Sequence, residues 1–201
     1  MTDVLSSVAG SGTPSAQTDR FVHDRLPPRD QWPDLRYDRP ELQIPGAANL
    51  VATLLDGAAA RGWGERPLLR SPSRTLSYAQ AATEVNRIAR VLTGELGLVP
   101  GNRVLLRGGN SVAMALAWLA VVKAGLVAVA TMPLLRAREL GDIIDKAQPT
   151  VALCDGKLLD ELRAAQAEHP VLDTFVAFNQ DGTAGSLEPR AAAQAGDFPA
   201  C

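Results

Sequence analysis

Two arginines, Arg136 and Arg138, are the side chains best placed to bind an anionic ligand. They lie in the stretch Pro133-Leu134-Leu135-Arg136-Ala137-Arg138, which follows an apolar run and opens a segment with helical spacing. Ligands of open α/β sheets bind outside the carboxyl ends of the strands, so cations at this point can meet a negatively charged group. The alternative is a solvated first turn, although the helix dipole slightly disfavours cations there. The residues alone leave both interpretations open.

A glycine pair, Gly108-Gly109, is the second feature at which a phosphate could bind. It lies between a β-rich run and an apolar helix, where backbone N–H groups are exposed. We favour a simpler interpretation, in which the glycines permit a tight turn below a buried helix. The sequence has no Gly-x-x-x-x-Gly-Lys-Ser/Thr loop, because Gly156-Lys157 lacks the upstream glycine, and no Gly-x-Gly-x-x-Gly follows a strand.

The remaining ionisable and nucleophilic residues form no catalytic pattern. His23 and His169 are isolated, without Cys or carboxylate residues at metal-ligand spacing. Ser77 and Ser111 precede helices as caps, and neither lies in a Gly-x-Ser-x-Gly elbow. Acidic residues on helix faces are better explained by solvation than by acid–base catalysis: Asp142, Asp145, Asp160 and Glu161. We therefore expect no catalytic side chain and no metal site.

The stretch 100–140 predicts the unit that must position the two arginines. Val104 to Leu106 is a short β-rich run, Val112 to Val122 has helical apolar spacing, and Leu126 to Ala130 is a second short apolar run. Gly125 supplies the positive φ after the helix. A strand, a helix and a strand so close together predict a βαβ unit with a parallel sheet and a right-handed crossover.

The pattern continues on both sides of this unit. Further strands are predicted at 150–154 and 174–178, with helices at 138–147 and 157–168. Even alternation of strands and helices predicts an α/β fold with a mainly parallel sheet flanked by helices. Upstream, the sequence predicts a helix opened by Asn49, a hairpin over Pro67 to Leu76, a Ser77/Gln80 capping box, and a helix that ends at Gly97.

Composition shifts divide the chain into four segments. We expect a disordered leader at 1–18, a Pro-rich arm at 19–48 that packs on the domain, an α/β subdomain at 49–178, and a linker at 179–201. The arm is too rich in proline for a long helix but carries apolar anchors: Phe21, Leu26, Trp32, Leu35, Tyr37, Leu42 and Ile44.

Composition also excludes several classes of protein. The formal net charge is −2, which argues against a nucleic-acid binder. Only Cys154 and Cys201 occur, so a disulfide framework is not expected and a reducing cytoplasm suits the chain. The N-terminus lacks the pattern of a secretory signal, and the longest apolar run, Val112 to Val122, is too short to span a bilayer.

Several motifs resemble one known superfamily. PGNRV, then NS, LAVVKAG and the Pro133 loop resemble core motifs of the acyl-adenylate-forming enzymes, and LSYAQ at 76–80 resembles their first core motif. LGLVPGNRVLLRGGN, VATMPLLRARELGDIIDKAQ and the arm FVHDRLPPRDQWPDL are most similar to the 2-aminobenzoate-CoA and benzoate-CoA ligase branch. The resemblance runs from about Asp19 to Phe178, and its motifs are specific in combination.

The resemblance implies an activity for the parent protein. It would activate an aromatic carboxylate such as 2-aminobenzoate or benzoate with ATP and Mg²⁺, and then transfer the acyl group to coenzyme A. A basic residue of the Pro133 loop can approach coenzyme A phosphates in related enzymes, which makes Arg136 and Arg138 the candidate coenzyme-binding residues. A homodimer is the oligomeric state that the resemblance suggests.

The resemblance also implies what this chain does not carry. The family binds ATP phosphates with a Ser/Thr/Gly-rich loop ending in Pro-Lys, binds ribose through a later acidic motif, and uses a lysine of a mobile C-terminal domain. None of these motifs occurs at a matching position here. We therefore expect an inactive N-terminal fragment that binds none of these ligands tightly, cut before its phosphate loop. The alternative is a complete, non-catalytic α/β domain with a binding or scaffolding role.

Overall fold

The computed structural model describes residues 15–34, 36–42, 45, 47–180 and 183–201. The strands are β1 (Pro67–Arg70), β2 (Thr75–Ser77), β3 (Arg103–Arg107), β4 (Val127–Thr131), β5 (Val151–Asp155) and β6 (Thr174–Phe178). The α-helices are α1 (Gly57–Ala60), α2 (Tyr78–Arg90), α3 (Val112–Lys123), α4 (Ala137–Ala147), α5 (Leu159–Glu168) and α6 (Leu187–Ala192). Short 3₁₀ turns occur at His23–Arg25, Arg29–Gln31, Pro40–Leu42 and Gly156–Leu158, and π-helical turns at Ala52–Asp56 and Val91–Glu95.

The centre of the fold is a four-stranded parallel sheet in the order β4-β3-β5-β6. Apolar side chains alternate between its two faces because successive residues of a strand point in opposite directions. Val104 and Leu106 pack on one face, whereas Leu105 belongs to the core on the other face. Both faces are covered, which explains why the strands are nearly continuous apolar runs. The predicted α/β fold and the predicted βαβ unit are confirmed.

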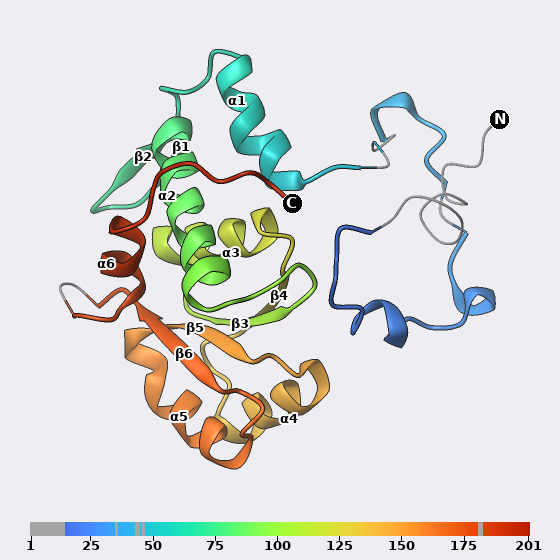
Figure 1. Ribbon diagram of the computed structural model, residues 1–201, viewed down its shortest axis with the longest axis vertical. Coiled ribbons are helices and arrows are strands. Elements are labelled where there is room, and N and C mark those ends of the chain that lie inside the picture. Colours follow the sequence, from blue (N-terminus) through green and yellow to red (C-terminus); the bar gives the residue numbers. More distant parts are fainter. Residues whose placement is uncertain (1–14, 35, 43–44, 46, 181–182) are drawn as a thin grey trace.

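Helices on opposite faces follow from the strand order. α3 connects β3 to β4 and packs with α2 on one face, while α4 and α5 cover the other (Figure 1). The chain steps outward from β3 to β4, then returns past β3 to β5 and continues to β6, so right-handed crossovers place α3 on one side and both α4 and α5 on the other. The direction changes between the neighbouring strands β3 and β5, and ligands of such sheets bind outside the carboxyl ends of the strands at this point.

The predicted helix caps are also present. Asn49 Oδ1 accepts the backbone N–H of Val51 at 2.9 Å, and Ser111 Oγ accepts that of Met114 at 3.1 Å. Ser77 and Gln80 form the reciprocal capping box that opens α2. These side chains satisfy N–H groups that have no partner within the helix, and so fix where each helix begins.

The arm touches the main body mainly through its first described residues. The backbone N–H of Asp19 donates to Pro100 O at 3.0 Å, and its carboxylate accepts from Asn102 Nδ2 and pairs with Arg103. Three of the predicted apolar anchors are partly exposed: Leu26 (44%), Tyr37 (37%) and Leu42 (48%). The predicted anchors Leu35 and Ile44, and most of the predicted leader, lie outside the described residues.

The C-terminal segment differs from the linker that the sequence predicts. Residues 187–192 form α6, and Leu187 and Ala191 are buried in the core against α2. The last residue lies at the end of α3, where Cys201 N–H donates to Lys123 O at 3.0 Å (Figure 1). The Ala- and Gly-rich composition obscured the helix because only two apolar residues, one turn apart, face the core.

No helix in the described part of the chain is long and apolar enough to cross a membrane.

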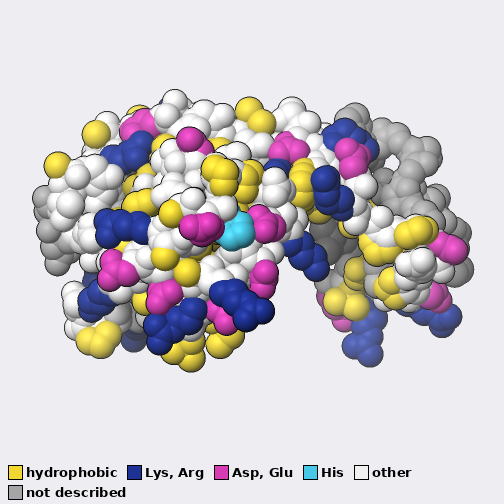
Figure 2. Space-filling model, turned by 90° about the horizontal axis from the view of Figure 1, so that it is seen from below, with side chains coloured by type: hydrophobic (Ala, Val, Ile, Leu, Met, Phe, Trp, Pro, Cys, Tyr) yellow, Lys and Arg dark blue, Asp and Glu magenta, His cyan; other side chains and the backbone are white. Residues whose placement is uncertain are grey.

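The face formed by α4 and α5 carries basic and acidic side chains side by side (Figure 2).

Candidate functional site

The turn between β4 and α4 lies at the carboxyl edge of the sheet, where the sequence predicts a ligand site. Met132 and Leu134 in this turn are 63% and 82% exposed. Arg136 is the last residue before α4, Arg138 lies in its first turn, and both side chains are exposed. The structure therefore brings the two predicted arginines together on one exposed edge, beside two exposed apolar side chains.

Arg136 is already paired with a carboxylate from the neighbouring helix. Its Nη1 donates to Glu161 Oε1 at 2.9 Å, and Glu161 Oε2 accepts the backbone N–H of Ala137 at 2.8 Å. The hydrogen bond from Arg136, followed by that from Ala137, lowers the pKa of Glu161, and the same pairing raises the pKa of Arg136. Glu139 accepts the backbone N–H of Arg136 at 2.9 Å. A phosphate that approaches Arg136 must therefore compete with Glu161.

Arg138 has a different environment. It makes no hydrogen bond or ion pair with the part of the chain that the structure describes. Its guanidinium is thus available to a ligand without loss of an internal contact. Of the two predicted residues, Arg138 has a guanidinium without an internal partner among the described residues, whereas the guanidinium of Arg136 is held by Glu161.

A third arginine lies beneath this turn, and the sequence analysis did not single it out. Arg107 ends β3 and is 1% exposed, yet it carries a charge. Its guanidinium donates to backbone carbonyl groups of the turn. In the sequence, Arg107 is recognisable only as a basic residue at the end of an apolar run. Hydrophobic periodicity predicts that such a residue is solvated at the end of its strand.

The Gly108-Gly109 turn has a packing reason for its first glycine. A Cβ atom at Gly108 would lie 2.7 Å from Cζ of Phe178, which is fully buried, so a side chain is excluded there. Gly109 is exposed, and a Cβ atom there would meet nothing within 4 Å. The structure supports the interpretation of a tight turn and gives no specific support to a phosphate site.

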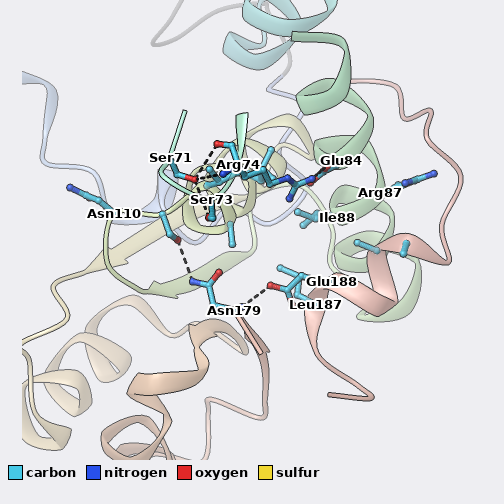
Figure 3. Close-up of a pocket in the computed structure, with 16 residues that line it drawn as sticks. Ser71, Ser73, Arg74, Glu84, Arg87, Ile88, Asn110, Asn179, Leu187 and Glu188 are labelled. Atoms are coloured by element: carbon cyan, nitrogen blue, oxygen red, sulfur yellow. Dashed lines mark hydrogen bonds and ion pairs between the residues drawn. The ribbon is translucent and has the colours of Figure 1, made fainter. Parts of the chain in front are cut away.

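A pocket of about 530 Å³ opens beside the N-terminus of α3 (Figure 3). The β1–β2 hairpin, α2, α3 and α6 supply its walls. Asn179, just after β6, donates through Nδ2 to Ser111 Oγ at 3.4 Å and through its backbone N–H to Glu188 at 2.6 Å. Arg74 and Glu84 form an ion pair in the same wall. Several polar groups of the pocket thus bind one another, whereas Arg87 Nε is buried without a hydrogen-bond partner in the described part of the chain.

One histidine lies in contact with an acidic side chain. His169 Nδ1 lies 2.7 Å from Asp145 Oδ1, a pair between the end of α5 and α4. Within the described residues, no group of three or more His, Cys, Asp or Glu side chains could hold a metal ion. Burial raises the pKa of the Cys154 thiol to about 12, so this cysteine is not a ready nucleophile.

Comparison with known protein families gives one match, to the model described as AMP-binding enzyme, over residues 57–198. A salicyl-AMP ligase / salicyl-S-ArCP synthetase of Mycobacterium tuberculosis is 40% identical over 88 residues, which are 41% of this chain and 15% of that protein. A 4-hydroxybenzoate–CoA/benzoate–CoA ligase of Rhodopseudomonas palustris is 26% identical over 140 residues, which are 70% of this chain and 26% of that protein.

Among solved structures, the anthranilate CoA ligase AuaEII in complex with anthranoyl-AMP superposes with a TM-score of 0.68 and 22% sequence identity. The match covers 75% of this chain and 28% of that chain, and at this identity it shows the shared fold. The chain thus spans about a quarter or less of the length of the relatives that it matches.

Proposed function

Because the chain belongs to the AMP-binding enzyme family, we propose that it is the N-terminal part of an ATP-dependent, AMP-forming acid–CoA ligase. In the first step of this reaction, a carboxylate oxygen attacks the α-phosphorus of ATP, and pyrophosphate leaves. In the second step, the thiol of coenzyme A attacks the acyl carbon, AMP leaves, and a thioester forms. The observation that carries the proposal is the family match over residues 57–198.

We propose an aromatic carboxylate, such as benzoate or 2-aminobenzoate, as the substrate. The names of two relatives refer to aromatic acids, salicylate in one case and 4-hydroxybenzoate or benzoate in the other. The motifs LGLVPGNRVLLRGGN and VATMPLLRARELGDIIDKAQ support the same branch.

The proposed role of this chain is to bind coenzyme A at the turn after β4. Arg136 and Arg138 supply two positive charges at the start of α4, where the helix dipole also favours anions. A phosphate of the coenzyme would contact Arg138 directly and would share Arg136 with Glu161. Exposed Leu134 gives the flat, apolar part of the nucleotide a surface to lie on.

Triphosphate chemistry is assigned to parts of the protein outside this sequence. The phosphate loop, the ribose-binding motif and the catalytic lysine of the family have no counterpart among these residues. Mg²⁺ would accompany the triphosphate, and the proposal assigns none of its ligands to this chain. The 201-residue chain by itself is accordingly proposed to be inactive.

A second candidate function, a non-catalytic binding domain, is favoured by one observation. The pocket beside α3 has a volume of about 530 Å³ and lies at the carboxyl edge of the sheet. A small ligand there would be bound without ATP. Ligase activity in the intact protein would make this alternative unnecessary.

The test uses the intact protein and measures its two half-reactions separately. Acid-dependent exchange of pyrophosphate into ATP reports adenylation, and thioester formation reports the use of coenzyme A. Arg136→Ala combined with Arg138→Ala is expected to raise the KM for coenzyme A and to leave pyrophosphate exchange unchanged. Lys146→Ala is the matched control, since it removes an exposed cation from the other end of α4. An unchanged KM for coenzyme A in the double variant would remove the coenzyme site from the proposal, and absence of exchange with every aromatic acid would remove the activity.

A further inference from the structure

Arg107 is a buried cation, and a purely structural role for it would lower the stability of the fold. It is 1% exposed at the carboxyl end of the central strand β3. Burial of a guanidinium lowers stability unless its N–H groups are satisfied, and an apolar side chain of similar size would fill the same space. The groups that accept hydrogen bonds from its N–H groups therefore indicate the role of this residue.

Among the described residues, every hydrogen-bond partner of Arg107 is a backbone carbonyl at the carboxyl edge of the sheet. Nη1 donates to Met132 O at 3.2 Å, and Nη2 donates to Pro133 O at 3.2 Å and to Leu135 O at 2.8 Å. Nε donates to Leu158 O at 3.3 Å, which lies just before α5. One planar group thus binds the turn after β4 and the turn after β5 together.

The geometry of this contact requires arginine. The guanidinium presents its donors in a rigid fork, whereas the ammonium of a lysine is a single point with three donors. The turn has one backbone hydrogen bond of its own, from Leu135 N–H to Met132 O at 3.2 Å. Within the described residues, the carbonyls of Pro133 and Leu135 have their donor in the fork, which therefore orients them. Loss of this contact would free the turn that ends at Arg136, although Arg107 itself touches no ligand.

We propose that Arg107 is a positioning residue for coenzyme A. It fixes the turn 132–136 against the start of α5, so that Arg136 and Arg138 meet the phosphates of the coenzyme in one geometry. This inference rests on the proposed function, because it concerns the same coenzyme site. It adds a residue that acts through the backbone of the turn and that does not act in adenylation.

The same strand provides a matched control. Arg103 begins β3, is 9% exposed, and donates to Ala147 O and Gln148 O, each at 2.9 Å. Arg103 is therefore also a buried arginine bound to backbone carbonyls, at the opposite edge of the sheet. Substitution of either arginine perturbs the core, but only substitution of Arg107 perturbs the coenzyme turn.

The experiment compares Arg107→Lys with Arg103→Lys in the intact protein. Arg107→Lys is expected to raise the KM for coenzyme A roughly tenfold, within the range expected when a binding group is misplaced by about an ångström. Acid-dependent pyrophosphate exchange should keep its wild-type rate. Trypsin should cleave after Arg136 and Arg138 faster than in the wild type, because the turn is released. Arg103→Lys should change neither the KM nor cleavage at these two sites.

Several results would overturn the proposal. They include equal effects of the two substitutions, a parallel loss of pyrophosphate exchange in Arg107→Lys, and an unchanged cleavage rate after Arg136. Faster cleavage with an unchanged KM also overturns it. In that case the Arg136/Arg138 double variant locates the error: if that variant raises the KM, only the role of Arg107 is wrong, and if it does not, the proposed coenzyme site is wrong. Should Arg107→Lys not fold, Pro133→Gly loosens the same turn with the arginine in place, and an unchanged KM in that variant rejects the proposal.

Discussion

Glu161 in α5 and Arg136, the residue before α4, form a hydrogen-bonded ion pair of 2.9 Å between Oε1 and Nη1. The second carboxylate oxygen of Glu161 accepts the backbone N–H of Ala137 at 2.8 Å, at the N-terminus of α4. One side-chain carboxylate thus occupies the cation and the backbone donor that an incoming phosphate would use. At the candidate coenzyme site, Glu161 therefore competes with a phosphate for Arg136 and for the N–H of Ala137.

The first prediction is that Glu161→Gln lowers the KM for coenzyme A in the intact protein. The amide still accepts the N–H of Ala137, but it no longer neutralises Arg136 or repels a phosphate. An exposed ion pair is weak and is screened by salt, so the KM should fall by only about two- to fivefold, and the difference should shrink at high salt. The measurement is the KM at two ionic strengths.

Asp160→Asn is the control for this prediction. It removes a fully exposed carboxylate from the adjacent position on the same helix, where Asp160 pairs with Arg163 and not with Arg136. An equal fall of the KM in Asp160→Asn would show that general charge, and not the contact of Glu161 with Arg136, controls the affinity.

The second prediction concerns the pH dependence of the same pair. The hydrogen bond from Arg136 and then that from Ala137 hold the pKa of Glu161 below its ordinary value of 4.5. A carboxyl group whose pKa is lower in the folded state stabilises the fold above the ordinary pKa, and this contribution is lost as the pH falls through the lowered value. The wild type should therefore be more stable to urea than Glu161→Gln at pH 7. The difference should narrow below about pH 4.5, and a constant difference across this range would contradict the prediction.

Local sequence signals predicted the fold because they act within a few residues. The caps at Asn49, Ser77 and Ser111 were predicted and confirmed, since each side chain bonds N–H groups two or three residues further on. The strands were predicted because their apolar runs are short and bounded by glycine or proline. The resemblance to the adenylate-forming superfamily was confirmed by the family match over residues 57–198.

The candidate site was predictable only in part. Its location at Arg136 and Arg138 came from chain order and from the resemblance, but the pairing of Arg136 with Glu161 depends on how α4 packs against α5. Arg107 and Lys123 were not singled out as buried charges, since periodicity treats a charged residue as solvated. Each is 1% exposed because a partner that is distant in the sequence satisfies its donors.

The third prediction concerns the buried pair of Lys123 and Asp56. Lys123 Nζ lies 2.7 Å from Asp56 Oδ1, and the lysine side chain is 1% exposed whereas the aspartate is 45% exposed. Asp56→Ala should lower the free energy of unfolding by about 2–3 kcal/mol, somewhat less than for a fully buried pair, because a buried ammonium loses its partner. Lys123→Met should cost less than about 1 kcal/mol, since it removes the charge and keeps the volume.

A double-mutant cycle checks this prediction by urea denaturation. In the Lys123→Met background, Asp56→Ala should have almost no effect, because no unpaired charge remains. Equal effects of Asp56→Ala in the two backgrounds would mean that the aspartate stabilises its helix in another way.

The fourth prediction compares two helical glycines that a sequence pattern treats alike. A Cβ atom at Gly141 in α4 would lie 2.3 Å from Nε2 of His169, whose ring is held by Asp145 at 2.7 Å, whereas a Cβ atom at Gly94 would meet nothing within 4 Å. Gly94→Ala should therefore raise the free energy of unfolding by about 0.5–1 kcal/mol, the usual gain of alanine in a helix. Gly141→Ala should lower it by about 1–2 kcal/mol, because the ring must move and its hydrogen bond with Asp145 is lost. Addition of His169→Ala to Gly141→Ala should recover part of this loss, and destabilisation that persists unchanged would show that the clash is with the backbone of α5 and not with the ring.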